Sequence, residues 1–320
     1  FWSVLGIVFG LGFVLSFGYW TTNFVEVQRA MASKDMNSAR RAPIIGSFPK
    51  MFIPFIIIVP GMLAAVLVPQ LAKYKASGGK GTAITYNDSL LLLMRSILPN
   101  GLLGIAIAGL LAAFMAGMAA NISAFNTVFS YDLWQTYVQK DKPDHFYTML
   151  GRVATLGATI IAVGTSLLAG QFSNIMNYLQ TLFGFFNAPL FATFILGMFW
   201  KRMTPTAAWV GLVLGTLSAV TMAFLSKDAF GSASLGVFNL SGQGASFVAA
   251  GTAFVVDIIA SVIVTSMTKP RAESELRGLV YSLTPKEDLL DDHADHWWLS
   301  APKLAGVSLV LVIILNVLFR

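Results

Sequence analysis

Charge is scarce in this chain, and cysteine is absent from it. Charged residues make up 11% of the 320 residues, whereas a soluble domain carries roughly 25%. With so few charged residues, much of the protein surface must face something other than water, which excludes an ordinary soluble protein. The absence of cysteine excludes disulfides, so cysteine usage gives no information on whether the protein lies in an oxidising or a reducing compartment. With 56% hydrophobic residues and a mean hydropathy of +0.72, the chain is expected to be a multi-pass protein of the cell membrane.

The motifs by which enzymes are recognised are also missing. There is no nucleophile with its base, no phosphate-binding loop and no carboxylate pair suited to acid–base chemistry. The stretch DDHADHW at 291–297 has metal-binding residue types, but it lies in a charged segment without a second cluster, so we expect a solvated loop. We expect neither an enzyme nor a nucleic-acid partner. We interpret the net charge of +6 as a sign of how the chain is oriented in the membrane, not as a sign of nucleic-acid binding. A channel is disfavoured because no ring of charges or filter-like repeat is present.

Eight apolar segments are long enough to cross a bilayer as helices, for which about 20 residues are needed. They lie at about 1–25, 50–70, 101–134, 150–169, 173–200, 206–225, 246–268 and 304–319. The shorter stretch at 85–98 predicts an interfacial helix. Because the chain begins with Phe1 and has no charged leader, we expect a fragment whose N-terminal part is missing.

Lysine and arginine are unequally divided between alternate connections. Fourteen lie in the connections after the first, third, fifth and seventh spans, and five lie in the others. Because cytoplasmic connections carry the excess of positive charge, the first set is predicted to be cytoplasmic and both termini external. Residues 268–302 are then a cytoplasmic linker before the last span.

Polar side chains recur at membrane depth, where they usually face a cavity or one another. Asn23 and Glu26 end the first span and Lys50 opens the second, although snorkelling at a membrane edge also explains Glu26 and Lys50. Asp257 stands alone in the seventh span without an obvious partner, and we leave it outside any site.

Three carboxamides form a stripe on the fifth span. Asn174, Asn177 and Gln180 are spaced three apart, which places them on one helical face. Hydrogen bonding between helices and contact with a hydroxyl-rich ligand both account for this stripe, and both remain open.

Proline and glycine interrupt two of the spans. Pro49, Pro54 and Pro60 fall in the second span, and Gly184 and Pro189 fall in the fifth. Such residues predict breaks that free backbone carbonyls, which are tolerated in a membrane only against protein or a cavity. Discontinuous helices of this kind are typical of secondary transporters.

Five stretches in order carry a resemblance. They are GYWTTNFVEVQRAM, PKMFIPFIIIVPGM, FSYDLWQTYV, GQFSNIMNYLQ and GMFWKRMTPTAAWVGLVLG. Together they resemble the sodium:solute symporter family, and within it the sodium/glucose cotransporter branch, from residue 1 to about 285. The last stretch has Ala207-Ala208 where the family usually has Gly-Ala.

The resemblance implies an all-α membrane protein of the LeuT type, with five plus five helices in an inverted repeat. Residues 1–200 would form the second repeat, and 201–320 three peripheral helices with the linker, in a single membrane domain. The implied activity is symport of a sugar or similar polar solute with a cation, sodium in this family, by alternating access.

The resemblance also implies roles for individual residues. Tyr19 would be the inner gate with Trp20 beside it, and Asn23 and Glu26 would form the inner mouth. Beside Tyr19 and Trp20, the solute would be contacted by Ser16, Lys50 and Gln180, and Asn177 of the carboxamide stripe is a further candidate for solute binding. This assignment is chemically reasonable, because an aromatic ring covers the C–H face of a sugar while amide and ammonium groups bind its hydroxyls.

The implied sodium site departs from the family's pattern. The positions that carry hydroxyls in the family fall on Ala116 and Gly117, and a further ligand position falls on Ala113. A hard cation prefers several oxygen ligands, so Asn121 and Ser123 are candidates for a displaced site. Coupling to sodium, coupling to protons and uncoupled transport all remain open, as does a membrane solute sensor of the same fold.

Overall fold

Helices make up nearly all of the part of the chain that the structure describes. The computed structural model describes residues 5–77, 84–169, 175–226, 235–238, 243–285 and 300–318. Seven helices in these ranges are long and apolar enough to cross a membrane, and a bent pair, Val8–Thr22 with Phe24–Met31, raises the number to eight. The prediction of an all-α, multi-pass membrane protein is confirmed.

The chain divides into two compact units. One comprises residues 1–27 and 171–292, and the other comprises residues 28–170 and 293–320. The predicted division between a repeat at 1–200 and peripheral helices at 201–320 stays a prediction.

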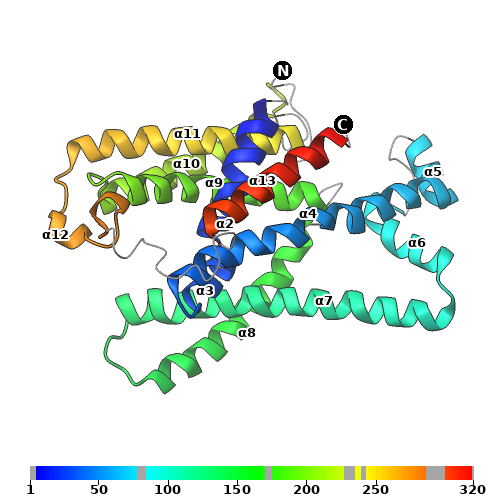
Figure 1. Ribbon diagram of the computed structural model, residues 1–320, viewed down its shortest axis with the longest axis horizontal. Helices are drawn as coiled ribbons and strands as arrows, with labels where there is room; N and C mark the ends of the chain where they lie inside the picture. The colour runs from blue at the N-terminus through cyan, green and yellow to red at the C-terminus, as the bar shows by residue number, and fades with distance from the viewer. Residues whose placement is uncertain are drawn as a thin grey trace. The chain divides into compact units, whose positions relative to one another are not determined.

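The first unit joins the N-terminal helices to the fifth, sixth and seventh predicted spans (Figure 1). Its elements are η1 (Gly6–Leu15, a π-helix), α2 (Ser16–Thr22), α9 (Ile175–Phe199), α10 (Pro205–Leu225), α11 (Gln243–Met267), α12 (Glu273–Leu276) and η5 (Tyr281–Leu283). Helices α10 and α11 run side by side, and α9 packs on both of them. Helix α3 (Phe24–Met31) begins in this unit and continues into the other.

Small side chains let α10 approach its neighbours closely. The buried residues of α10 are spaced four apart and share one face: Ala207, Gly211, Gly215, Ala219 and Ala223. A Cβ atom added at Gly215 would lie 2.7 Å from Cβ of Pro189 in α9 and 3.0 Å from the carbonyl oxygen of Ala253 in α11. Stripes of small residues are typical of helices that associate within a membrane, so α9, α10 and α11 form one tightly packed group.

The first predicted span is bent by 48° at Asn23. The side-chain oxygen of Asn23 accepts a hydrogen bond from the backbone N–H of Val25 at 3.1 Å. Its backbone carbonyl accepts from the N–H groups of Glu26 and Val27, both at 3.0 Å. Asn23 therefore starts α3 as its cap, and the carboxylate of Glu26 lies in the first turn, where the helix dipole favours negative charge.

The second unit contains the remaining helices (Figure 1). They are α4 (Met36–Leu67), α5 (Pro69–Ala76), η2 (Tyr86–Asp88), α6 (Ser89–Ile97), α7 (Asn100–Thr127), η3 (Val128–Gln135, a π-helix), α8 (Asp144–Ala169) and α13 (Ala301–Leu318). The predicted short helix at 85–98 is present as η2 and α6. Asp35 caps α4 by accepting a 2.6 Å hydrogen bond from the N–H of Ser38, and this bond lowers the pKa of Asp35.

The prolines do not break the helices, contrary to the prediction from the sequence. Helix α4 is continuous through Pro49, Pro54 and Pro60, and α9 is continuous through Gly184 and Pro189. A proline removes one helical hydrogen bond, and a membrane helix tolerates this when the neighbouring turns remain bonded. The interruption lies instead at Asn23, where a side chain replaces the missing helical bond.

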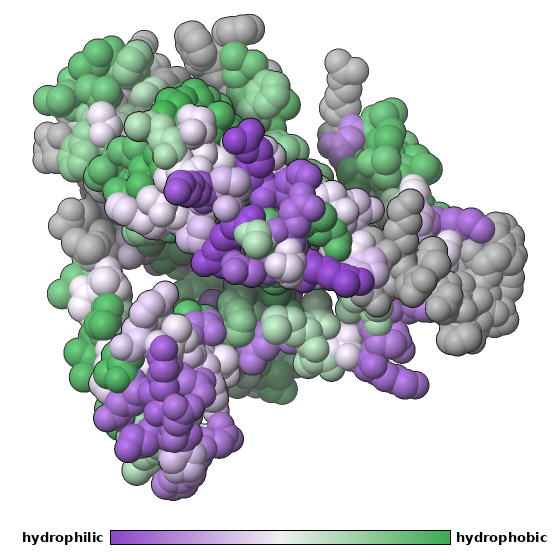
Figure 2. Space-filling model, turned by 90° about the vertical axis from the view of Figure 1, so that its left-hand side faces the viewer, coloured by the Kyte–Doolittle hydropathy of each residue, from purple (hydrophilic) through white to green (hydrophobic). Residues whose placement is uncertain are grey.

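The connections at one end of the first unit carry several of its charged side chains. Nζ of Lys201, in the connection after α9, donates to Oε1 of Glu273 in α12 at 2.7 Å. Nearby, the hydroxyls of Thr204 and Thr268 are 2.8 Å apart. The connection after the fifth span and the one after the seventh therefore lie together, and their cytoplasmic location stays a prediction. Figure 2 shows hydrophilic residues gathered in patches beside largely hydrophobic surface.

We expect Lys201→Ala to leave the thermal unfolding temperature unchanged at physiological salt. The two side chains are 54% and 64% exposed, and exposed pairs contribute little to stability. The hydrogen bond from Lys201 lowers the pKa of Glu273 below its ordinary 4.5. Any contribution is therefore present above about pH 4.5 and is lost as the pH falls further. Glu273→Gln should behave alike, and a drop in unfolding temperature that persists in high salt would contradict this expectation.

Candidate solute site on helices α2 and α9

Aromatic rings join α2 to α9. The ring of Tyr19 meets that of Trp20 edge to face, with centroids 6.4 Å apart at an interplanar angle of 87°. It also meets Phe183 of α9, with centroids 6.2 Å apart at 61°. Tyr19 and Trp20 are half-buried. The predicted gate residues thus form a small aromatic cluster on the last turn of α2, and Phe183 is a member that the sequence did not indicate.

Gln180 lies one turn from this cluster. It precedes Phe183 by three residues on α9, so the two side chains leave the helix on the same side. Nε2 of Gln180 lies 3.9 Å from Sδ of Met176, and a thioether is a weak acceptor. Gln180 is half-buried and lies one turn before Phe183 on the same face of α9.

Asn177 occupies the preceding turn of α9 and is half-buried. Its backbone carbonyl accepts a 2.8 Å hydrogen bond from the hydroxyl of Thr181. The oxygen of that hydroxyl also lies 2.9 Å from the hydroxyl of Ser246 in α11. Thr181 thus supplies a bond between helices beside the carboxamide stripe. Asn174, the first member of the predicted stripe, lies outside the described residues.

A second polar contact between α2 and α9 was not predicted. The hydroxyl of Thr22 donates to Oδ1 of Asn187 at 2.8 Å, and Nδ2 of Asn187 lies 3.5 Å from the carbonyl oxygen of Leu15. The spacing could have revealed Asn187, because it continues the series 177, 180, 184 and 187 along one face of α9. The sequence left two explanations open for the carboxamide face of α9, namely hydrogen bonding between helices and contact with a ligand. At Asn187 the first of these occurs.

Ser16 lies one turn before Tyr19, at the exposed start of α2. The structure therefore brings five of the predicted residues onto two packed helices: Ser16, Tyr19, Trp20, Asn177 and Gln180. Asn23 and Glu26 follow at the bend, where Asn23 caps α3. Their assignment to an inner mouth stays a prediction.

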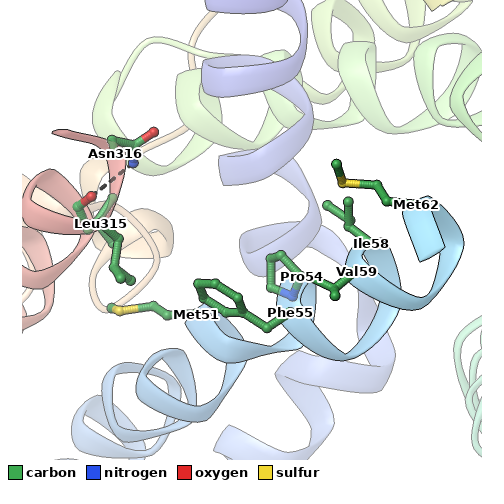
Figure 3. Close-up of a pocket in the computed structure, with 9 residues that line it drawn as sticks. Met51, Pro54, Phe55, Ile58, Val59, Met62, Leu315 and Asn316 are labelled. Carbon is green, nitrogen blue, oxygen red and sulfur yellow. Dashed lines mark hydrogen bonds between the residues drawn. The ribbon is translucent and has the colours of Figure 1, made fainter. Parts of the chain in front are cut away.

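Lys50 belongs to the second unit, on an exposed face of α4. The next residue, Met51, lines an apolar groove of about 610 Å³ between α4 and α13 (Figure 3). Asn316 is the single polar side chain among the lining residues, and its Nδ2 donates to the carbonyl of Val312 in its own helix at 2.9 Å. A polyhydroxylated solute needs convergent polar groups, which this groove does not offer.

The predicted sodium positions lie on α7. Ala113, Ala116 and Gly117 are exposed on a continuous helix and carry no side-chain oxygen. Nδ2 of Asn121 donates to the carbonyl of Gly117 at 2.9 Å. Ser123 is exposed. Over the described residues, no group of three or more His, Cys, Asp or Glu side chains is placed to hold a metal ion. The side chains at the three positions do not themselves fit a sodium ion, and a displaced site at Asn121 and Ser123 stays a prediction.

Comparisons with known proteins identify the family to which the sequence is similar. Residues 3–215 match the sodium:solute symporter family. The chain is 29% identical over 228 residues to the sodium/glucose cotransporter of Vibrio parahaemolyticus, covering 69% of this chain and 41% of the relative. It is 26% identical over 302 residues to sodium/glucose cotransporter 1 of Oryctolagus cuniculus, covering 89% and 45%. It is 28% identical over 222 residues to sodium/myo-inositol cotransporter 2 of Rattus norvegicus, covering 66% and 32%. The chain thus spans less than half the length of these relatives.

Proposed function

Since the chain belongs to the sodium:solute symporter family, we propose that it is the C-terminal portion of a secondary transporter that moves a sugar or cyclitol together with a cation. Relatives that are named for sodium with glucose or with myo-inositol support this solute class. Both solutes are rings with several hydroxyls, which amide groups and aromatic faces bind well.

One observation carries the assignment of the solute site. Tyr19 on α2 contacts Phe183, and Gln180 leaves α9 on the same side one turn away. An aromatic lid and a carboxamide from two different helices can cover one face of a ring and bind its hydroxyls. Lys50 stays a further candidate for solute binding, to which it would contribute an ammonium group.

The coupling ion is tested by ion replacement. Radiolabelled glucose and myo-inositol uptake is measured in proteoliposomes that contain the full protein, first in sodium and then in choline at constant pH. We expect uptake to fall to the level of protein-free liposomes in choline. Uptake that persists undiminished would show that sodium is not the coupling ion.

An alternative within the same fold is a proton-coupled or uncoupled carrier. The absence of hydroxyls at Ala116 and Gly117 favours it. Uptake in choline that follows an imposed pH gradient would identify the proton-coupled form, and uptake without any gradient dependence would identify the uncoupled one. Saturable solute binding without any flux would indicate a sensor instead.

A further inference from the structure

Asp257 lies at the centre of the packed group formed by α9, α10 and α11. Its side chain is 0% exposed, and the sequence indicated no partner for it. The structure corrects this view: the hydroxyl of Thr193 in α9 donates to Oδ2 of Asp257 at 2.9 Å. On the other side, Oγ of Ser261 lies 3.1 Å from Oδ1. Two hydroxyls from two helices therefore hold this carboxyl group.

Among the described elements packed around Asp257, no positive side chain lies where it could balance a charge on this residue. Helices α9, α10 and α11 contain no Lys, Arg or His, and Tyr178 is the other titratable residue within them. Of the other elements packed on α9 and α11, η1 contains no titratable residue, α2 contains Tyr19 and η5 contains Tyr281. The nearest cations along the packed helices are Lys201, eight residues after Thr193, and Lys269, twelve after Asp257. At 1.5 Å per residue these are about 12 and about 18 Å away along a helix, and Lys201 is paired with Glu273.

The hydroxyl of Ser261 lies within hydrogen-bond distance of two oxygen atoms but has only one proton to donate. Oγ of Ser261 lies 3.1 Å from Oδ1 of Asp257 and 3.3 Å from the carbonyl oxygen of Ala207 in α10. Both neighbours are acceptors if Asp257 is a carboxylate, but a serine hydroxyl has a single proton to donate. A proton on Oδ1 resolves this: Asp257 donates to Ser261, and Ser261 donates to Ala207.

The packing leaves no room for a metal ion between α10 and this carboxyl group. A Cβ atom at Gly211 of α10 would overlap Oγ of Ser261 and would lie 2.8 Å from Oδ1 of Asp257. At Gly215, a Cβ would lie 3.0 Å from Cβ of Asp257. The backbone of α10 therefore closes directly over the carboxyl group. Burying an uncompensated carboxylate is costly, and a bound proton removes that cost without needing space.

We propose that Asp257, Thr193 and Ser261 form a proton-binding site that fastens α9 to α10 and α11. One proton from water binds the carboxylate and converts it to a carboxylic acid, and no other reactant is involved. The acid then links the three helices through Thr193, Ser261 and the carbonyl of Ala207. This site is separate from the proposed solute site and does not depend on which ion drives transport.

Infrared spectroscopy tests the proposal on the full protein in lipid at neutral pH, without solute and without sodium. Protein labelled with carboxyl-¹³C aspartate is compared with unlabelled protein. We expect a carboxylic-acid C=O band that shifts with the label and with exchange into heavy water. The band should be absent from Asp257→Asn, whose amide can donate to Ser261 and accept from Thr193. If the protein lacks a label-sensitive acid band, or if Asp257→Asn retains it, the proposal is wrong. The isotope comparison requires no variant, so it remains valid if Asp257→Asn does not fold.

Two further measurements separate this site from its alternatives. Sodium chloride is titrated into the labelled protein, with choline chloride as the control. Loss of the acid band in sodium alone would mean that Asp257 binds sodium as a carboxylate, which would overturn the proposal. Ser261→Ala should shift the acid band, because the hydroxyl that accepts its proton is gone. Thr252→Val is the matched control, since the hydroxyl of Thr252 bonds within its own helix, and it should leave the band in place.

Discussion

Gln180→Ala is expected to raise the KM for solute uptake about tenfold, which corresponds to about 1.4 kcal/mol. A hydrogen bond between neutral groups contributes about 0.5–1.5 kcal/mol, and the carboxamide would make at least one bond to a solute hydroxyl. The maximal rate should change less, because the proposed role is in binding. The measurement is concentration-dependent uptake in proteoliposomes containing the full protein.

The matched control removes the same chemical group from a helix outside the proposed site. Asn316→Ala on α13 deletes a carboxamide that bonds to its own helix through the carbonyl of Val312, and it should leave KM unchanged. Equal uptake kinetics for Gln180→Ala and the unchanged protein would remove Gln180 from the solute site. Equal losses for Gln180→Ala and Asn316→Ala would point to a general loss of folded protein instead.

Gly10→Ala is expected to destabilise the first unit by about 1–3 kcal/mol, the usual cost of an extra methyl group in a well-packed contact. A Cβ at Gly10 would overlap the carbonyl oxygen of Phe247 in α11 and lie 2.8 Å from its carbonyl carbon. These are backbone atoms, which cannot rotate away as the end of a side chain can. Helix η1 would have to move off α11, and thermal unfolding of the purified protein should show a lower transition temperature.

Gly251→Ala provides the comparison for this substitution. Gly251 is one turn beyond Phe247 on α11, and a Cβ at that position meets nothing within 4 Å. Replacing a helical glycine in open space stabilises the helix by up to about 1 kcal/mol. The two variants should therefore change the transition temperature in opposite directions. A Gly10→Ala protein as stable as the unchanged one would show that η1 and α11 are not in direct backbone contact.

The spans were predictable because they depend on one quantity, the length of an uninterrupted apolar run. Each long helix of the described residues overlaps a predicted segment, and the short helix at 85–98 is also found. The breaks were not predictable from composition. Proline weakens a helix at one bond, but α4 retains enough neighbouring bonds to continue through Pro49, Pro54 and Pro60.

Candidate site residues could be proposed from the sequence only where one helix carries a clear pattern. Gln180 and Asn177 are recognisable because carboxamides at a spacing of three are unusual on an apolar helix. Phe183 resembles many other membrane phenylalanines in the sequence, and only the contact with Tyr19 distinguishes it. Asp257 seemed isolated because its partner Thr193 is 64 residues away, a distance that no local pattern can bridge.

The stripe on α10 has a mechanical consequence. A helix face made of glycine and alanine has almost no ridges, so it offers little resistance to sliding along a neighbouring helix. Specific register must then come from a few directional bonds, and the link from Ser261 to the carbonyl of Ala207 is one of them. The axial alignment of these helices would consequently depend on a few hydroxyl groups more than on the extent of their shared surface.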